Sequence, residues 1–419
     1  MHRKRVLFAS YVVMVCVYPL HCAAQDQEQP QSEKPRLHNY LFVRPAQNRM
    51  DVNALAKLAA SNPTQTLPLS TLYVDSSRDG NHYRVALVGS DPFTGGRSVS
   101  VPTFIVPLVI RTHEVGTSYD PKTGIVSTTP GIRAFNPTVA DTACLTSPND
   151  VPVTLLQQSP IFKPATFDFG GTVVGTTQYG DAFQRANFWK VDDHDTYHVL
   201  LGPVKTLKPV VIDVPAAYGL ALSPSAFGPP ALCAPHGIVD VEWFSNYLAG
   251  TVIPALAAQG VNPSTFPLFL LRNVAWNLTP VTNLSNCCGS IVTSITGVPI
   301  PTQTYVAADF DSTGFFGTDG KDTYSVSAGV GFWMNNPFEL NETPPWGNVG
   351  PIVGCTPTLD VTDPLVEAQA LRIAMPNGFT YHLEELAFLS WFFGAPSVGV
   401  NGWFSDNATF LTDAGPPCH

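Results

Sequence analysis

The alternation of apolar and polar residues predicts a chain that begins with strands and gains helices later. Strands at residues 71–75 and 83–89 flank an Asp79-Gly80 pair, which is typical of a tight β-hairpin turn. The continuous apolar run at residues 103–110 predicts a strand that is buried on both faces. Further strands are predicted at residues 198–201, 210–214 and 266–273.

Apolar residues at helical spacing predict four helices, at residues 51–60, 182–189, 323–335 and 382–393. Asp240 is a typical N-cap residue for a fifth helix, in which Val241, Phe244 and Tyr247 share one face. Strands followed by helices favour the α+β class, with a β-rich N-terminal half that contains a mixed sheet. Frequent Pro and Gly predict long loops throughout the chain, and a few helices are expected in the C-terminal half.

The first 24 residues have the pattern of a secretory signal peptide. The basic residues Arg3, Lys4 and Arg5 precede an apolar run at residues 6–18, which is shorter than the ~20 residues of a membrane helix. Cys22-Ala23-Ala24 fits a cleavage site, and cleavage is favoured over a lipid anchor on Cys22. We therefore expect a secreted or periplasmic protein without membrane attachment after cleavage.

The rest of the chain is predicted to be a tail and one domain. Residues 25–50 are expected to be a flexible N-terminal tail, since they begin with a polar stretch that lacks aromatic residues. Residues 51–419 are expected to form a single large α+β domain, because no repeat or low-complexity linker divides them. A division into a β-rich subdomain, 70–215, and a second subdomain, 216–419, stays open.

Composition narrows the class of protein. Hydrophobic residues make up 44% of the chain and charged residues 13%, so most of it can fold around a core. The net charge is −10, with 22 Lys+Arg against 32 Asp+Glu, and basic residues cluster only near the start. This balance argues against a nucleic-acid partner.

Six cysteines follow the predicted cleavage site: Cys144, Cys233, Cys287, Cys288, Cys355 and Cys418. In an oxidising compartment they predict up to three disulfides, with 15 possible connectivities. We expect at least two bridges, one of them using Cys287 or Cys288. A bridge between these adjacent residues would be strained, so each is expected to bond a distant partner. The alternative is that one or two cysteines are buried thiols.

Two histidine patterns begin like a metallopeptidase helix. His194 and His198 have i, i+4 spacing, but residues 198–201 have strand character, and on a strand the rings would lie ~13 Å apart. Two surface or loop histidines are therefore favoured. His113-Glu114 follows an apolar strand and is interpreted as an exposed strand end.

Two carboxylate patterns allow a metal. Asp309 and Asp311 begin a segment that resembles half of a calcium loop, but Gly320 stands where the bidentate acid is required. A turn whose aspartates accept backbone hydrogen bonds is favoured. His382 and Glu385 share one face of a predicted helix. That face could bind a metal or pair the two residues, and a buried hydrogen bond is favoured.

Several aromatic-rich segments resemble, in the same order, a large group of mostly uncharacterised secreted bacterial proteins. They are QYGDAFQRANFW at 178–189, FWMNNPF at 332–338, PWG at 345–347, DPL at 363–365, MPNG at 375–378, YHLEELAF at 381–388 and VNGW at 400–403. In that group, the helix before the Trp-Met-Asn segment usually reads Ser-His-Glu-x-x-Glu-Trp. Such a pattern is zinc-peptidase-like, since His binds the metal and the next Glu activates water.

This chain departs from that pattern at the positions of the metal-binding and water-activating residues. Ala328, Gly329 and Phe332 stand where the group has His, Glu and Glu. These side chains offer neither a lone pair for a metal nor a proton acceptor. The resemblance therefore implies a metallopeptidase-like C-terminal half, within 216–419, that has lost its catalytic residues.

Two functions stay open. The favoured one is a secreted, non-catalytic, pseudo-peptidase-like protein that binds an extracellular protein or polymer and holds no cofactor. The alternative is a secreted hydrolase with a non-standard site around His382, Glu385 and Asp309, and zinc is expected only in that case.

Overall fold

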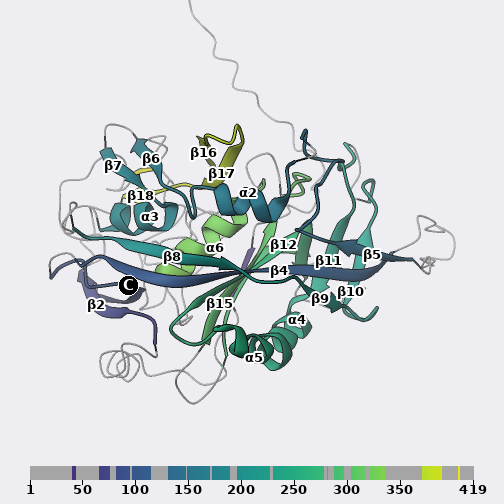
Figure 1. Cartoon of the computed structure of the whole chain (residues 1–419), viewed down its shortest axis with the longest axis horizontal. Coiled ribbons are helices and arrows are strands. Elements are labelled where there is room, and N and C mark those ends of the chain that lie inside the picture. Colours follow the sequence, from purple (N-terminus) through teal and green to yellow (C-terminus); the bar gives the residue numbers. More distant parts are fainter. Residues whose placement is uncertain are drawn as a thin grey trace, which may run out of the picture. The chain divides into compact units, whose positions relative to one another are not determined.

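A mixed sheet of eleven strands forms the framework of the compact unit 37–419 (Figure 1). The computed structural model describes residues 40–43, 66–75, 82–94, 97–114, 131–147, 149–169, 172–188, 196–226, 230–277, 281, 287–296, 303–316, 321–335, 370–388 and 404–405. The predicted signal peptide and the predicted helix at 51–60 lie outside these residues.

The strands of the large sheet are β1 (Tyr40–Val43), β4 (Val99–Glu114), β5 (Ile132–Phe135), β8 (Val199–Thr206), β9 (Val210–Asp213), β10 (Gly219–Leu222), β11 (His236–Asp240), β12 (Phe266–Arg272), β13 (Val274–Asn277), β14 (Cys287–Thr296) and β15 (Gln303–Phe310). The 16-residue β4 pairs in parallel with β8, β9, β10 and β12, and antiparallel with β5. The sheet takes strands from both sides of residue 215, so the two segments considered as subdomains share it.

Four smaller sheets each have two strands. They are β2 (Leu69–Asp75) with β3 (His82–Val88), β6 (Ala165–Phe169) with β7 (Thr172–Thr177), β16 (Ala370–Ala374) with β17 (Thr380–Glu384), and β18 (Ala387–Phe388) with β19 (Phe404–Ser405). The antiparallel pairing of β2 and β3 confirms the two strands of the predicted hairpin.

The helices are α2 (Pro152–Gln158), α3 (Tyr179–Asn187), α4 (Val241–Tyr247), α5 (Ile253–Leu256) and α6 (Tyr324–Asn335), with a π-helical turn, η1 (Leu248–Val252), and a 3-10 turn, η2 (Ala257–Gln259). The predictions at 182–189 and 323–335 are confirmed by α3 and α6. Asp240 caps α4 as predicted, since its Oδ1 accepts a hydrogen bond from the Trp243 backbone N at 2.7 Å. Among the described residues, no helix has the length and apolarity needed to cross a membrane.

The large sheet carries a hydrophobic core on each face, and alternation along the strands separates the two cores. In β12, Leu268 and Leu270 pack with residues of α3 and α6, while Phe269 and Leu271 pack with residues of α4 and η1. Because both faces are covered, β4 is apolar from Phe104 to Ile110 and β12 is apolar up to Arg272. The α+β class and the mixed sheet are confirmed.

The prediction of a helix at 382–393 is wrong where the structure describes this segment. Residues 380–384 form β17, which pairs with β16 across a turn at Gly378, where φ is 82°. Pairing with a strand nearby in sequence, through a turn that suits glycine, outweighs the helical spacing of the leucines. Residues 389–393 lie outside the described part.

Two further predictions concern the N-terminal tail and the disulfides. Residues 40–43 lie within the predicted tail and form β1, which pairs in parallel with β14. Among the residues that the structure describes, one disulfide is present, between Cys144 and Cys233, with Cα atoms 5.2 Å apart. Cys287 and Cys288 begin β14, while Cys355 and Cys418 lie outside the described residues. A second bridge stays a prediction.

Candidate functional site

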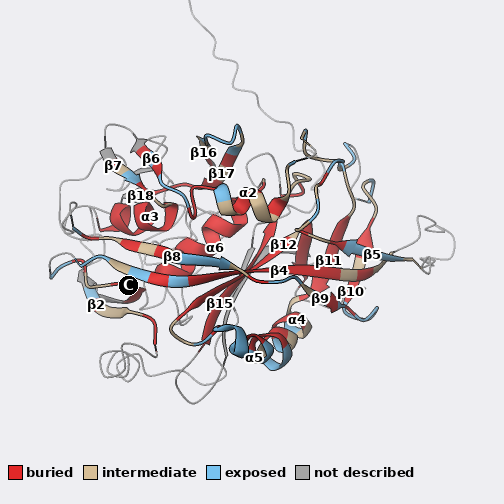
Figure 2. Ribbon diagram, in the orientation of Figure 1, coloured by how far each residue is buried: buried red, intermediate tan, exposed pale blue. Residues whose placement is uncertain are grey.

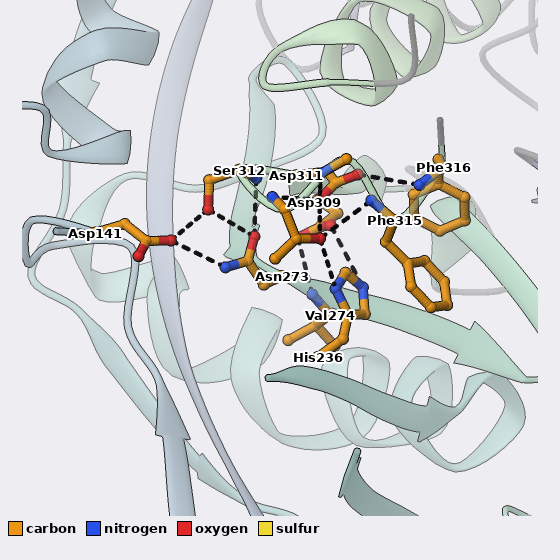
Figure 3. A network of polar contacts seen from close by, with 11 residues as sticks. Asp141, His236, Asn273, Val274, Asp309, Asp311, Ser312, Phe315 and Phe316 are labelled. Carbon is orange, nitrogen blue, oxygen red and sulfur yellow. Dashed lines mark hydrogen bonds and ion pairs between the residues drawn. The ribbon is translucent and has the colours of Figure 1, made fainter. Parts of the chain in front are cut away.

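Polar residues from three strands meet where β12 passes into β13. Arg272 at the end of β12 lies opposite Phe310 of β15, whereas Val274 at the start of β13 pairs with Gly237 of β11. The chain changes partners at Asn273, which has a φ of 54° in the left-handed region that asparagine tolerates. This bend gathers Asn273, Asp309 and His236 at one place (Figure 3).

Asn273 links this place to two loops. Its Nδ2 donates to Asp141 Oδ2 at 3.1 Å, and its Oδ1 accepts from the Ser312 backbone N at 2.9 Å. The Ser312 hydroxyl also contacts the same oxygen of Asp141. These contacts connect residues far apart in sequence, and Asn273 and Asp141 are both buried.

Asp309 and His236 face one another in a fully buried space. Asp309 Oδ1 accepts from the Val274 backbone N at 3.0 Å, and its Oδ2 lies 3.9 Å from His236 Nε2. Within the described part of the chain, neither Asp309 Oδ2 nor His236 Nε2 has a hydrogen-bond partner. The imidazole stacks on the ring of Phe315, with centroids 4.1 Å apart.

Burial determines the charge of this pair. Removal from water lowers the pKa of His236 to about 3, and it raises the pKa of Asp309 well above its ordinary value, with a further rise from neighbouring Asp311. At neutral pH the imidazole is therefore uncharged, and burial shifts Asp309 toward its protonated form. Because the imidazole carries no charge, the contact is not an ion pair.

Asp311 organises the turn that follows β15. Its Oδ1 accepts from the backbone N of Thr313 at 2.8 Å and of Gly314 at 3.1 Å, while its Oδ2 accepts from Phe316 N at 3.1 Å. This is the predicted turn in which aspartates accept backbone hydrogen bonds. Burial nevertheless raises the pKa of Asp311 to about 6. Among the described residues, no group of three His, Cys, Asp or Glu is placed to hold a metal ion.

The geometry of this network is poorly suited to nucleophilic catalysis. Thr313 Oγ1 lies 3.4 Å from His236 Nδ1, so Asp309, His236 and Thr313 follow one another in space as in a hydrolase triad. The Thr313 hydroxyl, however, donates to Asp311 at 2.6 Å, and both contacts of the imidazole are long. The ring is also fully buried, so the network is better suited to fixing the strand ends than to receiving a substrate.

His382 is held by an aspartate, Asp322, and not by Glu385, the partner considered from the sequence. Its Nδ1 lies 2.7 Å from Asp322 Oδ2, and its backbone N donates to Asp322 Oδ1 at 3.0 Å. The ring keeps 17% of its side-chain surface exposed. The favoured hydrogen bond is thus present, with Asp322 instead of Glu385 as the partner.

Glu384 and Glu385 are both fully buried. The Glu384 backbone N donates to the Ser327 hydroxyl at 2.7 Å, which places the end of β17 against α6. The three residues of the alternative site are therefore distributed: Asp309 faces His236, His382 pairs with Asp322, and Glu385 lies in the core.

Ala328, Gly329 and Phe332 lie on α6, whose twelve residues are all buried (Figure 2). Close contact with α3 contributes to this burial. A Cβ at Gly180 would lie 2.6 Å from Met334 Sδ, and a Cβ at Gly331 would lie 3.3 Å from the ring of Phe183. Side chains of neighbouring elements thus pack directly against this helix.

Another buried carboxylate, that of Asp181, fixes α3. Asp181 accepts hydrogen bonds from the Thr177 hydroxyl at 2.6 Å, from the Val199 backbone N at 2.7 Å and, at 2.8 Å, from His198 Nδ1. His198 lies directly before β8, as its strand character predicted, and keeps 29% of its side-chain surface exposed. His194 lies outside the described residues. His113 and Glu114 end β4, as predicted, but they are half-buried and not exposed.

Sequence reasoning missed Asp141, His236, Asn273 and Asp322. None belongs to a local motif, and each acquires its partner through the fold. The one signal in the sequence is that His236 lies three residues after Cys233, and Asp141 three residues before Cys144, so the disulfide closes beside both. Comparison with protein-family models, with curated proteins and with solved structures finds no match for this chain.

Proposed function

We propose that this chain is a non-catalytic, secreted or periplasmic protein that binds an extracellular ligand. The observation that carries the proposal is the chemistry of α6. At the positions where the resembling group has metal-binding and water-activating residues, α6 presents Ala328, Gly329 and Phe332, and Ala328 and Phe332 are 2% and 1% exposed. Zinc requires nitrogen, oxygen or sulfur ligands, and these three side chains have none.

The signal-peptide pattern and the Cys144–Cys233 disulfide support the location, because disulfides persist in oxidising compartments. The test is to purify the exported protein, sequence its N-terminus and measure zinc per chain by mass spectrometry. We expect a start near Gln25 and far less than one zinc per chain. Stoichiometric zinc, or export without processing, would contradict the proposal.

A second candidate function is favoured by the Asp322–His382 pair. A carboxylate that binds Nδ1 fixes the tautomer of an imidazole and directs Nε2 for proton transfer, as in many hydrolases. The test is to compare the protein with His382→Gln on a panel of ester and peptide substrates. Hydrolysis that His382→Gln abolishes would favour the hydrolase, whereas absent hydrolysis supports the non-catalytic protein. Equal hydrolysis by both proteins would contradict a catalytic role of His382.

A further inference from the structure

Tyr218, Trp243 and Tyr247 form a row of three nearly parallel rings, here called the aromatic stack. The rings of Tyr218 and Trp243 are inclined by 13° with centroids 5.8 Å apart, and those of Trp243 and Tyr247 by 14° with centroids 5.2 Å apart. At these separations nearly parallel rings are offset and overlap only in part, so the stack is stepped.

The backbone holds the aromatic stack in place before any ligand binds. Trp243 and Tyr247 are one turn apart on α4, and the Asp240 cap binds the Trp243 backbone N. Tyr218 belongs to the turn before β10, where its carbonyl accepts a hydrogen bond from the Asp240 backbone N at 2.8 Å. Asp240 therefore ties both parts of the stack together, and little ordering is required on binding.

The aromatic stack lies at the surface. Tyr218 is 42% exposed, and Trp243 and Tyr247 are half-buried against the core beneath α4. Neighbouring Glu242 on the same helix is exposed, and the chain as a whole has a net charge of −10. A polyanion would be repelled by this charge, which favours a neutral ligand.

We propose that the aromatic stack binds the sugar rings of a neutral polysaccharide. This inference rests on the proposed function, since it names the class of extracellular ligand. The face of a pyranose ring presents C–H groups in a flat apolar array that packs on an aromatic face, and its hydroxyls remain in water. A peptide anchor would instead need a pocket that removes it from water, whereas Tyr218 stays exposed.

The experiment is electrophoresis of the exported protein in native gels that contain hydroxyethyl cellulose, soluble starch or polygalacturonate. We expect one of the two neutral polymers to retard the protein and the polyanion to leave it unretarded. Trp243→Ala and Tyr218→Ala should each raise the polymer concentration needed for the same retardation at least tenfold. Tyr73→Ala is the matched control, because Tyr73 is 65% exposed on β2 and outside the stack.

No retardation by either neutral polymer would overturn the inference, as would equal retardation of Tyr218→Ala and Tyr73→Ala. Tyr218→Ala removes an exposed ring, so its result does not depend on a core residue. Stack-dependent capture of unfolded casein in place of the neutral polymers would assign the surface to a protein ligand and would also overturn the inference. Zinc measured in the same preparation tests the proposed function separately, because binding by the stack needs no metal.

Discussion

His236 Nε2 lies 3.9 Å from Asp309 Oδ2, and both side chains are completely buried. An uncharged imidazole and a carboxyl group whose pKa is raised by burial can share such a space, whereas an ion pair there would first have to leave water. The three strand ends around this pair are joined by the hydrogen bonds of Asn273 and Asp311. We therefore regard the network as a structural joint of the sheet, one whose stability depends on protonation.

The first prediction is that acidification stabilises this joint. The pKa of Asp311 is raised from its ordinary value of 3.8 to about 6, so between these values the folded protein binds more protons than the unfolded chain. The contribution of Asp311 to stability therefore falls as pH rises through this window. Asp311→Asn should reduce the pH dependence of the free energy of unfolding by on the order of 2–3 kcal/mol.

Urea denaturation between about pH 4 and about pH 7 measures this effect. The matched control is Asp213→Asn, because the Asp213 side chain is 69% exposed and forms a surface ion pair with Arg111. That variant should keep the original pH dependence. If Asp311→Asn keeps it as well, burial of Asp311 is not the cause.

The sequence predicted the parts of this joint that are local. The turn after β15 was predicted because Asp311, Thr313 and Gly314 are neighbours whose side chains and backbone interact within a few residues. Asp141 could not be assigned, since its partners Asn273 and Ser312 lie 132 and 171 residues away. For His382, spacing alone predicted a helix and Glu385 as partner, but pairing with β16 made it a strand residue 60 positions from Asp322.

The second prediction concerns the Cys144–Cys233 disulfide. The two cysteines are 89 residues apart in sequence, and closing a loop of this length restricts the unfolded chain strongly. Replacing both by Ser should lower the free energy of unfolding by about 2–5 kcal/mol. Denaturation without reductant measures the difference. The same variant, compared with the original protein in reductant, should show a much smaller difference, and a persistent large one would point to lost packing.

The third prediction is that Asp181 holds α3 against β8. Asp181→Ala removes the acceptor of three hydrogen bonds and leaves the buried Val199 backbone N without one, so we expect a loss of about 2–4 kcal/mol. His198→Ala removes one partly exposed donor and should cost less. Thermal denaturation of both variants tests the order. Equal losses would show that the imidazole, not the backbone contact, fixes the helix.

The last prediction is that Gly180 is required for the contact between α3 and α6. A Cβ at position 180 would lie 2.6 Å from Met334 Sδ and 3.2 Å from Val330 Cγ1, and both neighbours are buried on α6. Although alanine favours a helix, Gly180→Ala must displace these side chains, so we expect it to destabilise the protein by roughly 1–3 kcal/mol.

Gly250→Ala in η1 is the matched control, because no atom outside its own helix and chain neighbours lies within 4 Å of a Cβ there. It should stabilise the protein by about 0.5–1 kcal/mol through the reduced entropy of the unfolded chain. Denaturation midpoints of the two variants should therefore move in opposite directions. If Gly180→Ala stabilises the protein as Gly250→Ala does, α3 and α6 do not pack closely around Met334 and Val330.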